Sequence, residues 1–229
     1  MQLNADFSQR VAVHGAELAW TPSPIAGVER RMLDRVGGEV ARATSIVRYA
    51  PHSRFSAHSH DGGEEFFVLE GVFSDEHGDF PAGAYIRNPP TSRHTPGSES
   101  GCTIFVKLWQ FDLSDRTQVR IDTATLPYGS TPHRPGVEIM PLFKDAREEV
   151  RLERWAANSD IALPLPGGLE LLVLSGGFAE GGETFKPLSW LRLPLGSQLT
   201  AKAAASGCRL WAKLGHLAQA QNSPPPSHA

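Results

Sequence analysis

The sequence predicts an all-β protein made of two related domains in tandem. Short apolar or alternating runs such as EFFVLEGVF, AYIRN and TIFVKLWQF are separated by clusters of Gly, Pro and Ser, which is typical of strands joined by tight turns. The 229 residues include 22 Gly and 18 Pro, and helical periodicity is weak throughout. Short strands at regular spacing indicate a sandwich or barrel in each domain rather than a βαβ sheet.

An internal repeat defines the two domains. GGEEFFVLEGVF (62–73) matches GGLELLVLSGGF (167–178), YIRNPP (85–90) matches WLRLPL (190–195), and GCTIFVKLW (101–109) matches GCRLWAKLG (207–215). Upstream, GVE recurs at 27–29 and 136–138, and RYAPHS (48–53) pairs with RWAANS (154–159). We therefore predict domains at residues 1–118 and 119–217. The Pro- and Ser-rich segment 218–229 is expected to be a disordered tail.

One segment gives conflicting signals. KDAREEVRLERW (144–155) has a helical composition, but it aligns with EVARATSIVRY of the first repeat, which has the β-branched content of a strand. We predict a strand there, because the repeat requires the same element in both domains.

Four residues of the first repeat have the types and spacing of a metal site. His58 and His60 are two positions apart, and positions i and i+2 of a strand face the same side, so both imidazoles can reach one ion. Glu64 adds a carboxylate after the turn at 61–63, and His94 can arrive from a neighbouring strand. Three imidazole nitrogens and one carboxylate oxygen suit Zn, Fe(II), Mn, Ni or Cu(II). We predict one divalent transition metal per chain, held by His58, His60, Glu64 and His94.

The second repeat has lost all four of these residues together. At a constant offset of 105 positions, each predicted ligand is replaced by a leucine: Leu163, Leu165, Leu169 and Leu199. Leucines there would fill the space of a lost site, because empty cavities and unpaired buried polar groups are both unfavourable. The adjacent Glu65 persists as Glu170, so we predict that Glu64 is the ligand and that Glu65 is structural. The same reasoning gives scaffold roles to two basic pairs, Arg87 with Arg192 and Lys107 with Lys213.

Composition argues against several classes of protein. The net charge of −3 and a pI near 6.3 give no support for a nucleic-acid binder. No apolar run approaches the roughly 20 residues of a membrane span, and the N-terminal region lacks the apolar segment of a signal peptide. We expect a soluble cytoplasmic protein, in which Cys102 and Cys208 are small buried core residues without a disulfide.

Two segments resemble the motifs of a known family. RYAPHSRFSAHSHDGGEEFFVLEG (48–71) resembles the first cupin motif, and GDFPAGAYIRNPPTSRH (78–94) resembles the second. Within the cupins, residues 20–115 are most similar to the cupin domain of ChrR-type anti-sigma factors. The resemblance implies a bicupin of two jelly-roll β-barrels, the first binding a metal through His58, His60, Glu64 and His94, and the second degenerate. In that family the sensor's metal is zinc.

The resemblance leaves two functions open. Similar single-metal cupins include dioxygenases that cleave carbon–carbon bonds in diketones or hydroxyketones, which implies an Fe(II) enzyme acting on a small molecule. The alternative is a zinc-binding oxidative-stress sensor, an anti-sigma-factor-like module acting with a partner protein. ChrR-type proteins hold the sigma factor with an N-terminal helical domain that has its own His/Cys zinc motif. This sequence shows no such domain, which weakens the expectation of a sigma-factor partner. Because edge strands of cupins often pair between chains, we also expect a homodimer.

Overall fold

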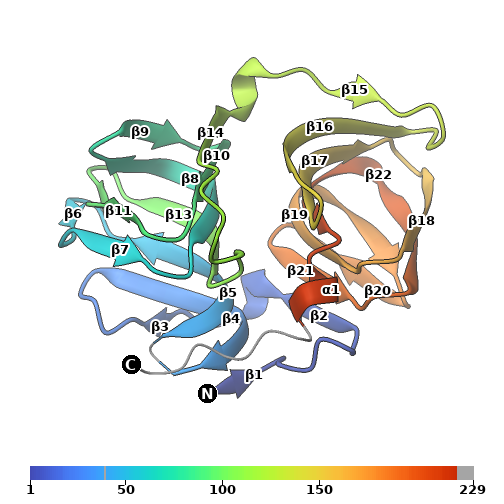
Figure 1. Cartoon of the computed structure of the whole chain (residues 1–229). Coiled ribbons are helices and arrows are strands. Elements are labelled where there is room, and N and C mark those ends of the chain that lie inside the picture. The colour runs from blue at the N-terminus through green and yellow to red at the C-terminus, as the bar shows by residue number, and fades with distance from the viewer. Residues whose placement is uncertain (39, 221–229) are drawn as a thin grey trace. The chain divides into compact units, whose positions relative to one another are not determined.

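The computed structural model describes residues 1–38 and 40–220, and it divides into two compact units (Figure 1). The first unit contains Met1–Ala5 and Ala19–Thr125. The second contains Asp6–Leu18 and, of the described residues, those from Leu126 to Ala220. Each unit is a jelly-roll barrel, so the predicted all-β fold with two tandem barrels is confirmed.

The first unit is built on one long antiparallel path of strands, in the order β1-β4-β5-β13-β8-β10-β14. Shorter strands complete the barrel: β3 pairs with β4, β9 with β8, β12 with β6 and β8, and β7 with β11. The bounds are β1 Gln2–Leu3, β3 Thr21–Pro22, β4 Val28–Gly37, β5 Ala41–Tyr49, β6 Ser53–Arg54, β7 His58–His60, β8 Glu64–Asp75, β9 Gly78–Pro81, β10 Ala84–Asn88, β11 Ser92–His94, β12 Gly97–Ser98, β13 Cys102–Leu108, β14 Val119–Asp122 and the 3₁₀ helix η2 Thr123–Thr125.

The second unit repeats the same order as β15-β16-β17-β22-β19-β21-β2, with β18 on β22 and β20 on β19. Its long strand β22 corresponds to both β11 and β13 of the first unit. One end of β22 pairs with β18, as β11 pairs with β7, and the other end pairs with β17 and β19, as β13 pairs with β5 and β8. The bounds are β2 Val11–His14, the 3₁₀ helix η1 Gly15–Glu17, β15 Gly129–Ser130, β16 Val137–Lys144, β17 Glu149–Trp155, β18 Asp160–Leu165, β19 Leu169–Glu180, β20 Glu183–Phe185, β21 Ser189–Leu193, β22 Ser197–Leu214 and the helix α1 Leu217–Ala220.

The division between the units differs from the predicted boundary at 118. Residues 119–122 form β14, which pairs along β10 and so completes the first barrel (Figure 1). In the same way β2, which precedes the first barrel in the chain, pairs with β21 and completes the second. Both strands are followed directly by a 3₁₀ helix, η2 after β14 and η1 after β2. The start of each repeat therefore supplies the last strand of the other repeat's barrel.

Two local predictions also meet the structure here. The segment 149–155 is the strand β17, as the repeat predicted and against its helical composition. The predicted tail began at 218, but residues 218–220 lie in α1, where Leu217 is buried. The rest of that tail, residues 221–229, lies outside the described residues. Within the described part of the chain, no helix has the length and apolar character needed to cross a bilayer.

A glycine in each repeat is required by the approach of two strands. Gly71 has φ 72°, and a Cβ there would lie 2.1 Å from the carbonyl oxygen of Gly101. Its counterpart Gly176 has φ 69°, and a Cβ would lie 2.1 Å from the carbonyl oxygen of Gly207. Any side chain would therefore separate β8 from β13, or β19 from β22. The two glycines thus allow each of these strand pairs to approach closely within its barrel.

Apolar side chains fill both barrels, and both cysteines are free and buried. In the second barrel Leu165, Leu169 and Leu199 are each 1% exposed and belong to one continuous core, against which the partly buried Leu163 packs. Leu163 and Leu199 are register partners on β18 and β22. The leucines predicted to fill the second barrel thus lie together in its interior.

Truncating one of these leucines should leave a cavity in the second barrel. We expect Leu165→Ala to lower the free energy of unfolding by about 2–5 kcal/mol, measured by urea denaturation followed by tryptophan fluorescence. Leu126→Ala is the control, because Leu126 is 39% exposed and should change stability little. An unfolding free energy for Leu165→Ala within about 0.5 kcal/mol of wild type would contradict a filled interior.

Candidate metal centre

The four predicted ligands lie at one end of the first barrel. His58 and His60 are the outer residues of β7, so their side chains share a face. His94 ends β11 and is the register partner of His58, which brings the third imidazole to the same face. Glu64 begins β8, directly after the turn that ends β7. Two short strands and the start of a long one therefore converge on one point.

The distances show how closely the donor atoms gather. One ligand atom from each of His58, His60 and His94 lies within 4.8 Å of the others. His60 Nε2 is 2.9 Å from His94 Nε2, and Glu64 Oε2 lies 3.3 Å from the first and 3.6 Å from the second. His94 is 3% exposed and Glu64 6%, whereas His58 is exposed. The predicted residues thus form one cluster, buried on one side and open on the other.

Hydrogen bonds to the far ring nitrogens orient two of the imidazoles. His58 Nδ1 lies 3.0 Å from the carbonyl oxygen of Ser56, and His94 Nδ1 lies 3.2 Å from Asp75 Oδ2. A carbonyl and a carboxylate only accept, so each Nδ1 must donate, and a neutral ring then carries its lone pair on Nε2. Metal-binding histidines are commonly held in this way. Asp75 was not predicted from the sequence.

The charges around the cluster are set by burial and by these contacts. Burial lowers the pKa of His60, although the charge of Glu64 acts in the opposite direction. Burial acts on His94 in the same sense, but the hydrogen bond to Asp75 and the charges of Glu64 and Asp75 outweigh it and raise the pKa of His94. Burial would raise the pKa of Asp75, yet the hydrogen bonds from His94 and the His77 backbone lower it. Asp75 is therefore the ionised acceptor for His94 at neutral pH.

Asn88 is a second residue that the sequence prediction missed. It is 4% exposed, and its Nδ2 donates to Glu64 Oε2 at 3.2 Å. Its counterpart in the second repeat is Leu193, so YIRNPP and WLRLPL already contained the signal: a polar residue lost together with the four ligands. Glu65 instead accepts a hydrogen bond from the Tyr85 hydroxyl at 2.6 Å. The choice of Glu64 for the cluster agrees with this geometry.

The residues fit a transition metal. The site offers three imidazoles and one carboxylate as metal ligands. The Nε2 lone pairs of two imidazoles are available for a metal, and an amide holds the carboxylate. Such a ligand set suits Zn, Fe(II), Mn, Ni or Cu(II). Without an ion, these ligand atoms are mostly hydrogen-bond acceptors placed close to one another, and few N–H groups lie between them to donate hydrogen bonds. The donor chemistry thus points to a cation.

Comparison with known protein families gives a match in the first part of the chain. Residues 8–112 match the family of the ChrR cupin-like domain. The matched segment contains all four predicted ligands. We refer to the first unit as the ChrR cupin-like domain. A search of curated proteins gave no sequence match.

Solved structures share the fold of both units at low sequence identity. A candidate dioxygenase from Nostoc punctiforme superposes with a TM-score of 0.72 at 17% identity, covering 100% of this chain and 86% of that one. The bacterial pirin YhhW from Escherichia coli, solved in complex with nickel(II), gives 0.65 at 14%, covering 90% and 99%. A salicylate 1,2-dioxygenase from Pseudaminobacter salicylatoxidans gives 0.63 at 13%, covering 96% and 88%. These similarities identify the bicupin fold.

A cavity of about 350 Å³ opens onto the cluster in the ChrR cupin-like domain. His58, His60 and Glu64 lie in its wall. The remaining lining is mostly apolar and includes Val28, Val47, Tyr49, Phe55, Ile104, Val106, Leu108 and Trp109, with Arg30 and Arg35 among the polar residues. The volume is at the small end of the range for ligand pockets. The metal donors are thus accessible to a small molecule.

Trp109 in this wall is held in an unfavourable backbone conformation. Its φ is 58°, in the left-handed region that bulky residues avoid at a cost of roughly 1–3 kcal/mol. The counterpart is Gly215, with φ 86°. The indole lies directly over Gly62, where a Cβ would come within 2.1 Å of Trp109 Cδ2. The ChrR cupin-like domain therefore keeps a large aromatic wall where the second repeat has only hydrogen.

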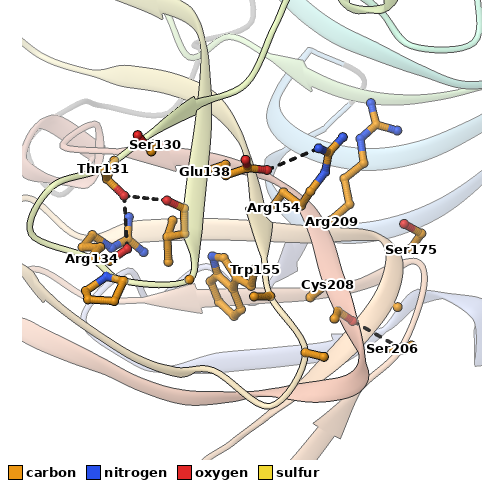
Figure 2. Close-up of a pocket in the computed structure, with 17 residues that line it drawn as sticks. Ser130, Thr131, Arg134, Glu138, Arg154, Trp155, Ser175, Ser206, Cys208 and Arg209 are labelled. Atoms are coloured by element: carbon orange, nitrogen blue, oxygen red, sulfur yellow. Dashed lines mark hydrogen bonds and ion pairs between the residues drawn. The ribbon is translucent and has the colours of Figure 1, made fainter.

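A larger cavity, of about 800 Å³, lies in the second unit (Figure 2). Arg154 and Arg209 are register partners on β17 and β22, and Figure 2 shows Glu138 bonded to Arg154. Arg154 Cζ lies 4.1 Å from the ring centroid of Tyr128, whose hydroxyl accepts from Arg209 Nε at 3.0 Å. Arg154 is thus held by Glu138 and by the ring of Tyr128, and Arg209 is held by the hydroxyl of the same tyrosine.

The same arrangement recurs in the first unit. Arg48 Nε donates to Glu29 Oε2 at 3.1 Å, and Arg48 Cζ lies 4.3 Å from the centroid of Trp20, beside a cavity of about 590 Å³. Glu29 and Arg48 are the repeat counterparts of Glu138 and Arg154. A feature present in both repeats belongs to the scaffold, so the larger cavity is not the candidate site despite its size.

Proposed function

We propose that the ChrR cupin-like domain binds one divalent transition metal through His58, His60, Glu64 and His94 and is a small-molecule enzyme of dioxygenase type. The observation that carries this proposal is the cavity that opens onto the ligand cluster, where His58 remains exposed. A metal that serves only to hold strands together is normally enclosed by four protein ligands, whereas a catalytic one keeps an accessible position.

The metal, when bound, would supply a Lewis acid and, in the case of Fe(II), a centre for oxygen chemistry. The chain's own residues would do the rest. Asp75 and the Ser56 carbonyl hold two imidazoles in the ligating tautomer, and Asn88 holds one carboxylate oxygen of Glu64. The apolar wall that includes Phe55 would displace water from a bound substrate.

The family match supports a second candidate function. The matched domain is named for ChrR, and the resemblance to ChrR-type proteins implies a zinc-binding sensor of oxidative stress. In that case an oxidant or ligand entering the cavity would alter the metal cluster and, through it, a surface recognised by a partner protein. The two functions share the ligands and differ in metal and in turnover.

The number of metal sites per chain can be tested by substitution. His60→Ala should abolish stoichiometric metal binding, because it removes a donor from the centre of the cluster. Leu165→His is the matched variant at the equivalent position, and it should create no second site, since a lone imidazole among leucines has no further donors. Metal content of the purified proteins, measured by inductively coupled plasma mass spectrometry, checks both. More than one tightly bound metal per wild-type chain would contradict the proposal.

Asp75 should matter through His94. We expect Asp75→Asn to weaken metal binding about 10- to 100-fold, because an amide can present an N–H to His94 Nδ1 and release the ring from its ligating tautomer. Competition with a chromogenic chelator measures this affinity. Asp79→Asn is the control, since Asp79 accepts from Ser74 and touches no histidine. Equal affinities for Asp75→Asn and wild type would remove the positioning role.

Metal identity and oxygen uptake separate the two functions. Protein purified without added metal is analysed, then loaded anaerobically with Fe(II) and screened for oxygen consumption with small ketones and carboxylates. Iron with substrate-dependent uptake is the result expected for the enzyme. Zinc in the purified protein, with no uptake after iron loading, would support the sensor instead.

A further inference from the structure

Arg30 faces the same cavity as the ligand cluster. It lies on β4, where its register partner is Val47 of β5, a residue of the barrel core. Both residues line the cavity that His58, His60 and Glu64 also line. Alternation along β4 places the next residue, Arg31, on the other face, where its Cζ lies 4.3 Å from the centroid of Trp20.

No described residue neutralises Arg30. Its half-buried side chain has no ion pair, hydrogen bond or ring contact within residues 1–38 and 40–220. Arg48, on the neighbouring strand β5, is instead held by Glu29 and Trp20. A half-buried cation without a countercharge would be stabilised by a ligand that supplies the negative charge.

The second repeat shows what this position looks like without a ligand. Arg30 corresponds to Ile139, which packs against the core of the second barrel. The register partner of Ile139 is Glu153. This buried carboxylate accepts hydrogen bonds from Arg134, at 2.7 Å, and from Arg151. The second repeat thus has an apolar residue in place of Arg30, as it does in place of the four predicted ligands and Asn88, and the buried Glu153 beside Ile139 is paired. The absence of Arg30 from the second repeat ties it to the site and not to the scaffold.

The rest of the cavity wall defines the remainder of the ligand. Apart from the ligands and Arg30, it is formed mainly by aliphatic and aromatic side chains, with the strained Trp109 among them. A bound metal with one carboxylate ligand carries a net positive charge, and Arg30 adds another. Arg35 also lines the cavity, and Asp61 is the one carboxylate there besides Glu64, so the positive groups outnumber the negative ones. A cavity of about 350 Å³ with this excess of positive charge and mostly apolar walls favours a small organic anion with an apolar body.

We propose that the cavity binds a small organic carboxylate whose carboxylate is held by Arg30 and whose apolar body packs against Phe55 and Trp109. This inference rests on the proposed metal centre in one respect, because the metal would fix where the reacting part of the molecule lies. The recognition of the carboxylate by Arg30 does not depend on the metal. A guanidinium suits the task because its planar N–H groups match the two oxygens of a carboxylate.

The test uses benzoate and its neutral isostere benzamide, titrated by isothermal calorimetry into the metal-loaded and the metal-free full chain. Wild type should bind benzoate at least about 10-fold more tightly than benzamide, since an ion-assisted hydrogen bond is worth that factor or more. Arg30→Met should remove this preference, and Arg30→Lys should keep part of it. Arg31→Met is the matched control, because it changes the same charge on the opposite face of β4 and should keep the preference.

Metal content and thermal unfolding are measured on every sample. Wild type that binds metal but shows no preference for benzoate would overturn the carboxylate proposal and leave the metal proposal standing. Wild type that takes up no metal on loading but prefers benzoate, with the preference lost in Arg30→Met, would support Arg30 and overturn the metal centre. Equal loss of preference in Arg30→Met and Arg31→Met would assign the effect to general charge and so overturn the role of Arg30.

Discussion

Polar groups that lack partners are unfavourable in the interior of a closed β-barrel, and the two halves of this chain meet that constraint in different ways. Away from water, each unpaired donor or charge costs free energy that packing cannot recover. The first barrel gathers three imidazoles and a carboxylate so that one cation could satisfy all of them. The second has leucines in place of the set, and its buried carboxylate Glu153 is paired with two arginines. The main differences between the two interiors follow from this choice between polar ligands for a cation and leucines that fill the same space.

The duplication explains how much of the site could be predicted from the sequence. Four residues that became leucine together identified the cluster, and the persistence of Glu65 as Glu170 assigned the ligating role to Glu64. The alternating runs and turns gave the fold class, because they report on local backbone preference and on one buried face. The alignment of the two repeats also showed Asn88 and Arg30 as polar residues that correspond to Leu193 and Ile139. They were missed because neither has the spacing of a ligand motif.

Other features could not have been predicted, because they depend on contacts between distant parts of the chain. Asp75 lies at the end of β8, and its counterpart Glu180 forms an ion pair with Arg10 at 2.7 Å. An acidic residue therefore persists at this position and serves a ligand in one unit and a surface arginine in the other. The strained φ of Trp109 likewise becomes meaningful only when its ring is seen over Gly62. Sequence comparison shows which residues changed, and the structure shows what each one touches.

The reciprocal placement of β2 and β14 bears on where this chain came from. A strand that begins one repeat and finishes the barrel of the other is what gene fusion would make of two identical subunits that exchanged their leading strands. In such an ancestor neither subunit was complete alone. Joining the two would raise the local concentration of each exchanged strand and remove the need for self-association. The second barrel remains necessary without the predicted ligands, because it receives β2 and because its own leading strand, β14, completes the first barrel.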